Sequence, residues 1–340
     1  MRILWALPLL VLTTALAQPS LSLVDSENSG QGPCGIASAR IQGRSYLLTG
    51  AHLDDTVSTY RVDRNGGLTL ADTATLAAGS RPASIGFAYG RYAVVANNGS
   101  SDLYVYSVNR NGQLQQVGQP VSSQGVGPTN MDVAATGLVA VTHGTSNEVS
   151  TFWLDFRGRL RFLDKAATGA TPTDVAIRGT RLVVANAGSG ELGVYRLGLR
   201  GLEHQSQTFM GVGPIELDLD LSGRNAFVTT GPAVAGGQAQ VRSVQIDRQG
   251  TVTTVATVDA GLFASGIVLS GREVLVGSVG LGVQNELRVY DRDLNLLSTT
   301  TGVGPTPGAI TLVADRVGRS RYVFVNEFDN GVTSSYELSR

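Results

Sequence analysis

Short apolar runs separated by Gly, Asn and Ser recur along almost the whole chain. Residues 174–177, 181–185 and 192–195 are typical, because each run is short, rich in β-branched residues and bounded by turn-forming residues. No stretch with the period of an amphipathic helix competes with this pattern. The sequence therefore predicts an all-β protein built from many short strands.

An internal repeat of about 46 residues organises these strands. A turn glycine recurs in five repeats, and an aromatic or β-branched residue stands six positions before each glycine. Two further tyrosines continue this second series without a glycine after them. The glycines are Gly66, Gly112, Gly158, Gly201 and Gly250, and the second series is Tyr60, Tyr106, Phe152, Tyr195, Val244, Tyr290 and Tyr336. Seven repeats of about four strands predict a seven-bladed β-propeller of four-stranded antiparallel blades.

The two ends of the chain predict how this ring closes. The last repeat stops after its third strand, at residues 336–340, whereas residues 21–25 resemble the fourth strand at 68–72. The N-terminus should therefore supply the outer strand of the last blade, which removes two exposed sheet edges. A linear arrangement of two domains is the alternative.

The first 17 residues have the pattern of a secretory signal peptide. Arg2 precedes an apolar run over residues 3–12, and the small-residue pattern Ala15-Leu16-Ala17 follows it. The run is shorter than the ~20 residues that span a bilayer. We therefore expect one propeller domain over residues 18–340, secreted or periplasmic, with no transmembrane segment after signal removal. An uncleaved anchor is the alternative.

Composition narrows the possible partners. The chain has 26 Lys and Arg against 27 Asp and Glu, with Lys165 as its one lysine, so a basic nucleic-acid surface is excluded. Cys34 is the single cysteine, which excludes an intrachain disulfide, and its apolar setting favours a small buried residue over a nucleophile. No dinucleotide fingerprint or zinc pattern occurs, so we expect no cofactor. We also expect a monomer.

The repeats resemble a known family. Residues 182–186 (Leu-Val-Val-Ala-Asn), followed by 190–195 (Gly-Glu-Leu-Gly-Val-Tyr), and the Gly-x-Gly-Pro turns before apolar strands resemble lactonase-type seven-bladed propellers related to 6-phosphogluconolactonase. They are also similar to the Tyr-Val-Thr-Asn repeat propellers of cell surfaces. The resemblance covers residues 18–340 and implies a lactonase-like fold and a small-molecule lactone as substrate.

The Pro turns depart from that family. Lactonase-type members often carry His or Arg just after the proline, whereas this chain has Gly-Pro-Thr-Asn at 127–130, Thr-Pro-Thr-Asp at 171–174 and Gly-Pro-Ile-Glu at 213–216. Among these turns Arg81 alone offers a cation for a phosphate. We therefore expect a lactone other than 6-phosphogluconolactone. The alternative is a non-catalytic envelope or extracellular propeller that binds a protein or glycan.

Propeller topology gathers several polar residues on one face. Asn130, Asp174 and Glu216 follow successive Pro turns, whereas Asn97, His143, Asn186 and Asn326 belong to loops between the second and third strands of their blades. We expect His143 to act as the general base for water, with Glu216 or Asp174 orienting it, and Asn130, Asn97, Asn186 and Arg81 to bind substrate. The alternative is that these are turn residues, since Asn and His both tolerate left-handed backbone.

Glu216, Asp218 and Asp220 alternate with leucines. A period of two would place all three carboxylates on one strand face. Either a hard cation, or hydration and hydrogen bonds in the channel, could compensate them. Because no calcium loop of recognised spacing is present, we assign no metal.

Overall fold

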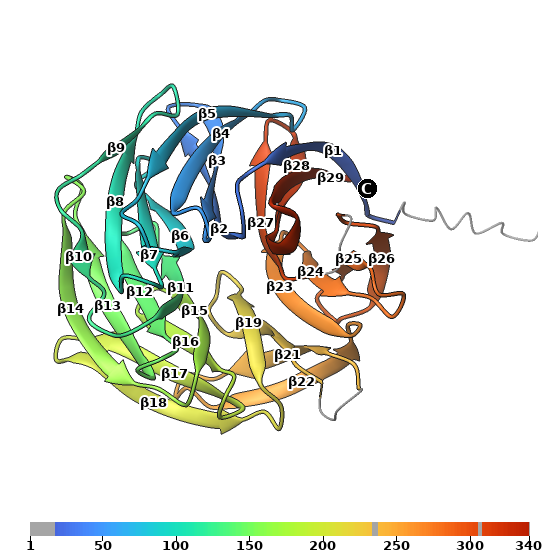
Figure 1. Cartoon of the computed structure of the whole chain (residues 1–340). Coiled ribbons are helices and arrows are strands. Elements are labelled where there is room, and N and C mark those ends of the chain that lie inside the picture. Colours follow the sequence, from blue (N-terminus) through green and yellow to red (C-terminus); the bar gives the residue numbers. More distant parts are fainter. Residues whose placement is uncertain (1–17, 233–236, 305–307, 340) are drawn as a thin grey trace, which may run out of the picture.

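The apolar runs of the sequence form seven antiparallel sheets arranged in a ring around a central channel (Figure 1). This computed structural model describes residues 18–232, 237–304 and 308–339. The predicted seven-bladed propeller is confirmed. The expected signal peptide, residues 1–17, lies outside the described residues and stays a prediction.

Each blade runs from an innermost strand at the channel to an outermost strand at the rim. The strands are β2 (Pro33–Ile41), β3 (Arg44–Ala51), β4 (Thr56–Val62) and β5 (Leu68–Thr75) in blade 1; β6 (Pro82–Ala88), β7 (Tyr92–Asn97), β8 (Asp102–Val108), β9 (Leu114–Gln116) and β10 (Val121–Ser122) in blade 2; β11 (Pro128–Val133), β12 (Leu138–His143), β13 (Glu148–Leu154) and β14 (Leu160–Ala167) in blade 3; β15 (Pro172–Arg178), β16 (Arg181–Asn186), β17 (Glu191–Gly198) and β18 (Gly201–Phe209) in blade 4; β19 (Pro214–Leu219), β20 (Asn225–Thr230), β21 (Gln240–Ile246) and β22 (Val252–Asp259) in blade 5; β23 (Phe263–Ser270), β24 (Glu273–Val279), β25 (Asn285–Tyr290) and β26 (Leu296–Thr301) in blade 6; and β27 (Ile310–Val317), β28 (Ser320–Glu327), β29 (Val332–Ser339) and β1 (Ser20–Asn28) in blade 7.

Two features depart from simple four-stranded blades. The outer strand of blade 2 is broken, so that β9 and β10 pair with opposite ends of β8. A short 3-10 helix, η1 (Phe328–Asn330), follows β28. No helix in the described ranges is long and apolar enough to cross a membrane.

The hydrophobic core lies between neighbouring blades. All six residues of β7 are buried, whereas β5 alternates towards solvent. One cluster packs Leu48 of blade 1 against Val95 of blade 2, and similar clusters follow around the ring. Stacked sheets thus bury both faces of the inner strands, which explains why those strands are apolar without strict alternation.

The repeated turn glycines contact the neighbouring blade. Gly112 has φ of 85°, and a Cβ there would lie 2.6 Å from Cε1 of Tyr46 in the preceding blade. The hydroxyl of Tyr46 donates to the carbonyl of Arg110 at 2.7 Å. Gly66 packs on Tyr322 and Gly158 on Tyr92 in the same way. The glycine is required for its left-handed backbone and for the close approach of this ring.

The predicted ring closure is confirmed. Strand β1 pairs antiparallel with β29, with Leu21 opposite Leu338 and Leu23 opposite Tyr336. The likeness of residues 21–25 to 68–72 has a physical basis, because Asp25 and Asp72 both accept a backbone N–H from the next blade, at 2.7 and 2.8 Å.

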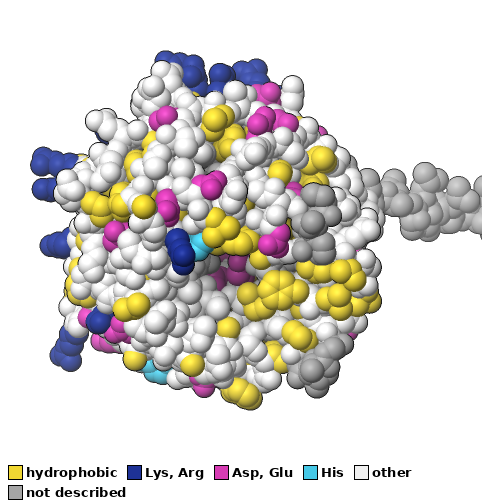
Figure 2. All heavy atoms as spheres, viewed as in Figure 1, with side chains coloured by type: hydrophobic (Ala, Val, Ile, Leu, Met, Phe, Trp, Pro, Cys, Tyr) yellow, Lys and Arg dark blue, Asp and Glu magenta, His cyan; other side chains and the backbone are white. Residues whose placement is uncertain are grey.

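The two faces of the ring differ in charge. We call the side of the strand 2–3 loops and the strand 4–1 connections the loop face, and the side of the strand 1–2 and 3–4 hairpins the hairpin face. In the described loops of the loop face Arg81 is the one residue of the Lys and Arg type, and Figure 2 shows most Lys and Arg side chains at its rim. Arginines lie in or beside most hairpins of the other face: Arg44, Arg64, Arg91, Arg110, Arg157, Arg181, Arg200, Arg224, Arg248, Arg272, Arg292 and Arg319.

The closing strand generates a stability prediction. Leu21 is 6% exposed and packs in the cluster that contains Leu338 and Tyr336, whereas Leu23 on the same strand is 59% exposed. We expect Leu21→Ala to lower the free energy of unfolding by about 2–4 kcal/mol in denaturant titrations. The matched control Leu23→Ala should change it by less than about 0.5 kcal/mol.

Deletion of residues 18–27 is the stronger test of closure. Because it leaves β29 as an unpaired edge, the protein should aggregate or lose much of its melting temperature. A truncated protein that stays monomeric and equally stable would contradict the closure argument.

Candidate functional site

The central channel contains an acidic cavity of about 260 Å³. The innermost strands of all seven blades line it, and its carboxyl groups are Asp132, Asp174, Glu216 and Asp218. Figure 2 shows acidic side chains in the central hollow of the loop face, with hydrophobic side chains beside it. This cavity brings together Asn130, Asp174 and Glu216, as the sequence predicts.

An irregularity in strand pairing positions these residues. The register between the first and second strands shifts just after the proline in blades 3, 4 and 5, between Pro128 and Asn130, Pro172 and Asp174, and Pro214 and Leu217. Such a bulge redirects a side chain. The Pro turns thus mark where each blade presents a polar group to the channel.

Asp174 is held by three hydrogen bonds. It is 6% exposed, and its carboxylate accepts the N–H of Val175, the N–H of Leu217 and Nδ2–H of Asn130, each at 2.7 Å. Burial nevertheless raises its pKa to about 8, against the effect of the two backbone donors. Asp174 therefore titrates close to neutral pH.

Glu216 has a different environment. It is half-buried, and its Oε2 accepts one backbone N–H, from Ile267 at 3.3 Å. Burial and then the charge of Asp174 raise the pKa of Glu216 well above its usual value. With fewer donors than Asp174, Glu216 is the better holder of a proton, so Asp174 is the first of the two to ionise as the pH rises.

Asp132 and Arg178 belong to the same region and were missed from the sequence. Arg178 places Nη2 3.1 Å from Oδ1 of Asp218 and Nη1 3.8 Å from Oδ2 of Asp132. Burial raises the pKa of Asp218 to about 6, and of Asp132 in the same direction, while Arg178 opposes both shifts. The period-two spacing of Asn130 and Asp132, which matches that of Glu216 and Asp218, could have identified Asp132.

The predicted acidic stripe is wrong at its last member. Asp220 follows the end of β19 and accepts hydrogen bonds from Ser222 and Asn225 within the hairpin, outside the cavity. Protein donors compensate Glu216 and Asp218 instead. Within the residues that the structure describes, no three His, Cys, Asp or Glu side chains are grouped to hold a metal ion.

His143 lies away from these carboxyl groups. It ends β12 fully buried, and its Nε2–H donates to Oγ of Ser150 at 2.8 Å, because that hydroxyl itself donates to the carbonyl of Ser123. A Cβ on Gly125 would lie 2.5 Å from Cγ of the imidazole. Burial lowers the pKa of His143 to about 4. It does not line the cavity.

The other predicted binding residues also lie elsewhere. Asn97 and Asn186 occupy the position of His143 in their blades and are fully buried, and Nδ2–H of Asn97 donates to Asp102 at 2.8 Å. Arg81 is exposed on the loop face with φ of 54°, and its N–H donates to Asp55 at 2.6 Å. Asn130 is therefore the one predicted binding residue that lines the cavity.

Cys34 lines the cavity as well. The expectation of a buried thiol holds in part, because the residue is half-buried. Burial and the charge of Glu216 raise its pKa to about 11, so the group is a protonated thiol at neutral pH. This chemistry agrees with the expectation that Cys34 is no nucleophile.

The sequence matches a known family of propellers. The profile of the family "Lactonase, 7-bladed beta-propeller" matches residues 9–138 and 44–177. No curated protein matches the chain in sequence.

Solved structures show the same fold at low sequence identity. A functionally unknown protein from Desulfotomaculum acetoxidans is 12% identical, with a TM-score of 0.67 over 82% of this chain and 88% of its own. A candidate 6-phosphogluconolactonase from Bacteroides uniformis is 16% identical, with a TM-score of 0.65 over 86% and 95%. A catalytically inactive virginiamycin B lyase from Staphylococcus aureus, with quinupristin, is 12% identical, with a TM-score of 0.66 over 95% and 100%.

The chain is thus a seven-bladed β-propeller whose innermost strands enclose an acidic cavity. Its sequence matches the profile of lactonase-type propellers over residues 9–177, which confirms the resemblance found in its repeats.

The unequal hydrogen bonding of the two acids predicts unequal structural roles. Asp174→Asn would turn an amide N–H towards one of three existing donors, which leaves a buried conflict. We expect it to lower the free energy of unfolding by about 1–3 kcal/mol. Glu216→Gln resembles the protonated acid and should cost less than about 1 kcal/mol. If thermal and denaturant unfolding showed the same loss of stability in Asp174→Asn and Glu216→Gln, this assignment would be refuted.

Proposed function

We propose that the protein hydrolyses a small, neutral lactone in the channel cavity, with Asp174 and Glu216 as an acid–base pair. The observation that carries the proposal is the position of two carboxyl groups with raised pKa values in one cavity, Asp174 buried and Glu216 half-buried. Pairs of titratable groups with different environments are typical of acid–base sites. The lactonase-type fold supports this class of hydrolase.

The reaction uses the different hydrogen bonding of the two groups. Ionised Asp174, held by its three donors, accepts a proton from water while the water oxygen attacks the lactone carbonyl carbon. The ring C–O bond then breaks, and protonated Glu216 donates its proton to the leaving ring oxygen. The product is an open hydroxy acid, and transfer of the proton from Asp174 to Glu216 through solvent restores the pair. Asn130 acts as a positioning residue through its hydrogen bond to Asp174.

Charge in the cavity selects the substrate class. Four carboxyl groups line it, and Arg178 beside them is already engaged by Asp132 and Asp218. A phosphate would lose its hydration without gaining a free cation. This argument favours an uncharged lactone over 6-phosphogluconolactone. A cavity of about 260 Å³ suits a small ring.

His143 takes a structural role in this proposal. Its imidazole is buried against Gly125 and bonded to Ser150, and a pKa of about 4 makes it a weak base. We also propose export of the chain, which rests on the signal-like pattern of residues 1–17. A monomer in the periplasm or outside the cell remains part of this proposal.

A panel of neutral lactones assayed on the purified chain tests the proposal. Glu216→Gln should lower turnover of a responsive lactone about a hundredfold to ten-thousandfold, since it removes a positioned acid. Glu203→Gln, the same exchange at an exposed position of β18, is the matched control and should leave turnover unchanged. His143→Asn, which copies the residue of blades 2 and 4, should retain most activity. If His143→Asn lost as much as Glu216→Gln, the base would be reassigned to His143.

The pH dependence separates the same two assignments. Because Asp174 must be ionised, the rate constant corrected for spontaneous hydrolysis should rise with pH through about 8. A rate that instead rises through about pH 4 and stays level would indicate His143 as the base.

The competing function is a non-catalytic propeller that binds a protein or glycan. This function is favoured if no lactone in the panel is turned over. It is also favoured if a lactone is turned over but Glu216→Gln leaves the rate unchanged.

A further inference from the structure

A second cavity, larger than the first, lies at the hairpin end of the channel between blades 6 and 7. Its volume is about 600 Å³, and it is lined by Leu269 and Ser270 from β23 and by Ala314 and Asp315 from β27, together with three arginines. Residues 267–268 and 311–312 of the same two strands line the acidic cavity. The two cavities therefore follow one another along the channel, with opposite chemistry.

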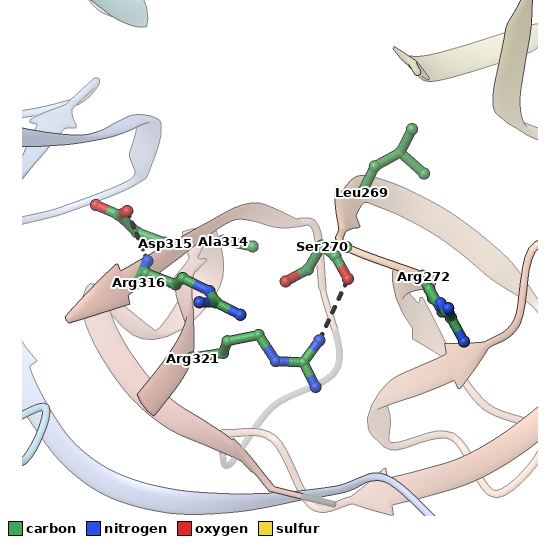
Figure 3. A pocket seen from close by; sticks show the side chains of 8 residues that line it. Leu269, Ser270, Arg272, Ala314, Asp315, Arg316 and Arg321 are labelled. Atoms are coloured by element: carbon green, nitrogen blue, oxygen red, sulfur yellow. Dashed lines mark hydrogen bonds between the residues drawn. The ribbon is translucent and has the colours of Figure 1, made fainter. Parts of the chain in front are cut away.

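The three arginines come from three positions around this cavity. Arg272 is in the hairpin between β23 and β24, Arg316 is near the end of β27, and Arg321 is in β28. Figure 3 shows the guanidinium groups of Arg316 and Arg321 extending into the same space, with Arg272 beyond Ser270. The Asp315 carboxylate points away from them, because it accepts the N–H of Arg316 at 2.6 Å.

One of these arginines is fixed in place. Arg321 is 15% exposed, and its Nη1 donates to Glu273 at 2.5 Å. The same Nη1 donates to the carbonyl of Ser270 at 3.4 Å, a bond that Figure 3 shows. Glu273 is 2% exposed, so this pair is buried and its charge is balanced. The remaining guanidinium edge of Arg321 is held in a defined orientation for a planar oxyanion.

The other two arginines supply uncompensated charge. Arg272 and Arg316 are exposed, and in the described part of the chain their guanidinium groups make no ion pair. The hairpin face around them is rich in arginine, which raises the local concentration of anions. Exposed arginines on a convex surface are simply solvated. Arg272 and Arg316 instead line a cavity next to the fixed guanidinium group of Arg321.

We propose that this second cavity binds a small oxyanion ligand, one that carries a phosphate or carboxylate group. Arg321 orients the oxyanion, and Arg272 and Arg316 contribute charge-assisted hydrogen bonds from the rim. The site is independent of the proposed hydrolysis, because it uses no residue of the acidic cavity.

Calorimetric titration of the intact chain with inorganic phosphate, and separately with succinate, tests the proposal. We expect saturable binding of at least one probe, weakened about tenfold by Arg272→Gln and by Arg316→Gln. Both variants should fold, since neither guanidinium group makes an ion pair with any residue that the structure describes. Raising the ionic strength should weaken binding, as expected for partly exposed charges.

Arg319→Gln is the matched control, because Arg319 is exposed in the same hairpin as Arg316 but does not line the cavity. Glu216→Gln should also leave anion binding unchanged, which keeps this test separate from that of the hydrolase. Absence of saturable binding of both probes would overturn the proposal. So would an equal loss of affinity in Arg319→Gln, which would indicate diffuse surface charge instead of a site.

Discussion

The ring depends on polar side chains that reach from one blade to the next at the channel. Oγ of Ser84 in blade 2 donates to Asn130 of blade 3, Asn130 donates to Asp174 of blade 4, and Asp174 accepts the N–H of Leu217 in blade 5, each at 2.7 Å. Sheets that pack by apolar faces alone can slide, because hydrophobic contacts are not directional. This chain of hydrogen bonds fixes the relative position of four blades where they are closest together.

The same interaction creates the candidate site. A carboxylate that joins two blades must be placed on an innermost strand, and there burial raises its pKa. Asp174 is thus a structural link and a titratable group in one residue, whereas Glu216 forms one weaker link and is freer to exchange a proton. Folding stability and chemistry therefore depend on the same side chain more strongly at Asp174 than at Glu216. A trade-off between stability and activity is common at active sites.

The sequence predicted those features of the fold and the site that recur from repeat to repeat. The turn glycines recur because they approach the preceding blade closely, as Gly112 does at Tyr46. The tyrosines of the repeat also reach the preceding blade, since the hydroxyl of Tyr60 donates to the carbonyl of Asn28 and that of Tyr195 to the carbonyl of Ala167. Residues 21–25 could be recognised as a fourth strand because Asp25 accepts a backbone N–H from the next blade, as Asp72 does. Asn130, Asp174 and Glu216 could be placed together because they share one position of the repeat.

The sequence could not show burial at the ends of strands. His143 and Asn97 stand where a polar residue precedes a loop, which resembles an exposed turn, yet each side chain turns back to bond the third strand or its surroundings. Arg178 was equally hidden, because its partners Asp132 and Asp218 come from blades on either side of its own. Contacts of this kind depend on the curvature of the ring, which no single repeat contains.

The departure from the lactonase-type pattern after the Pro turns has a structural explanation. Where such propellers often carry His or Arg, Thr129 donates to the carbonyl of Pro172 at 2.8 Å and Thr173 to that of Ile215 at 2.7 Å. A short hydroxyl side chain reaches the neighbouring blade, whereas a long cation would extend into the channel. Positions that could have supplied cations for a phosphate thus join blades instead, so the carboxyl groups dominate the channel. This exchange of binding charge for blade-to-blade contact supports the proposals of an uncharged substrate for the acidic cavity and of anion binding at the hairpin face.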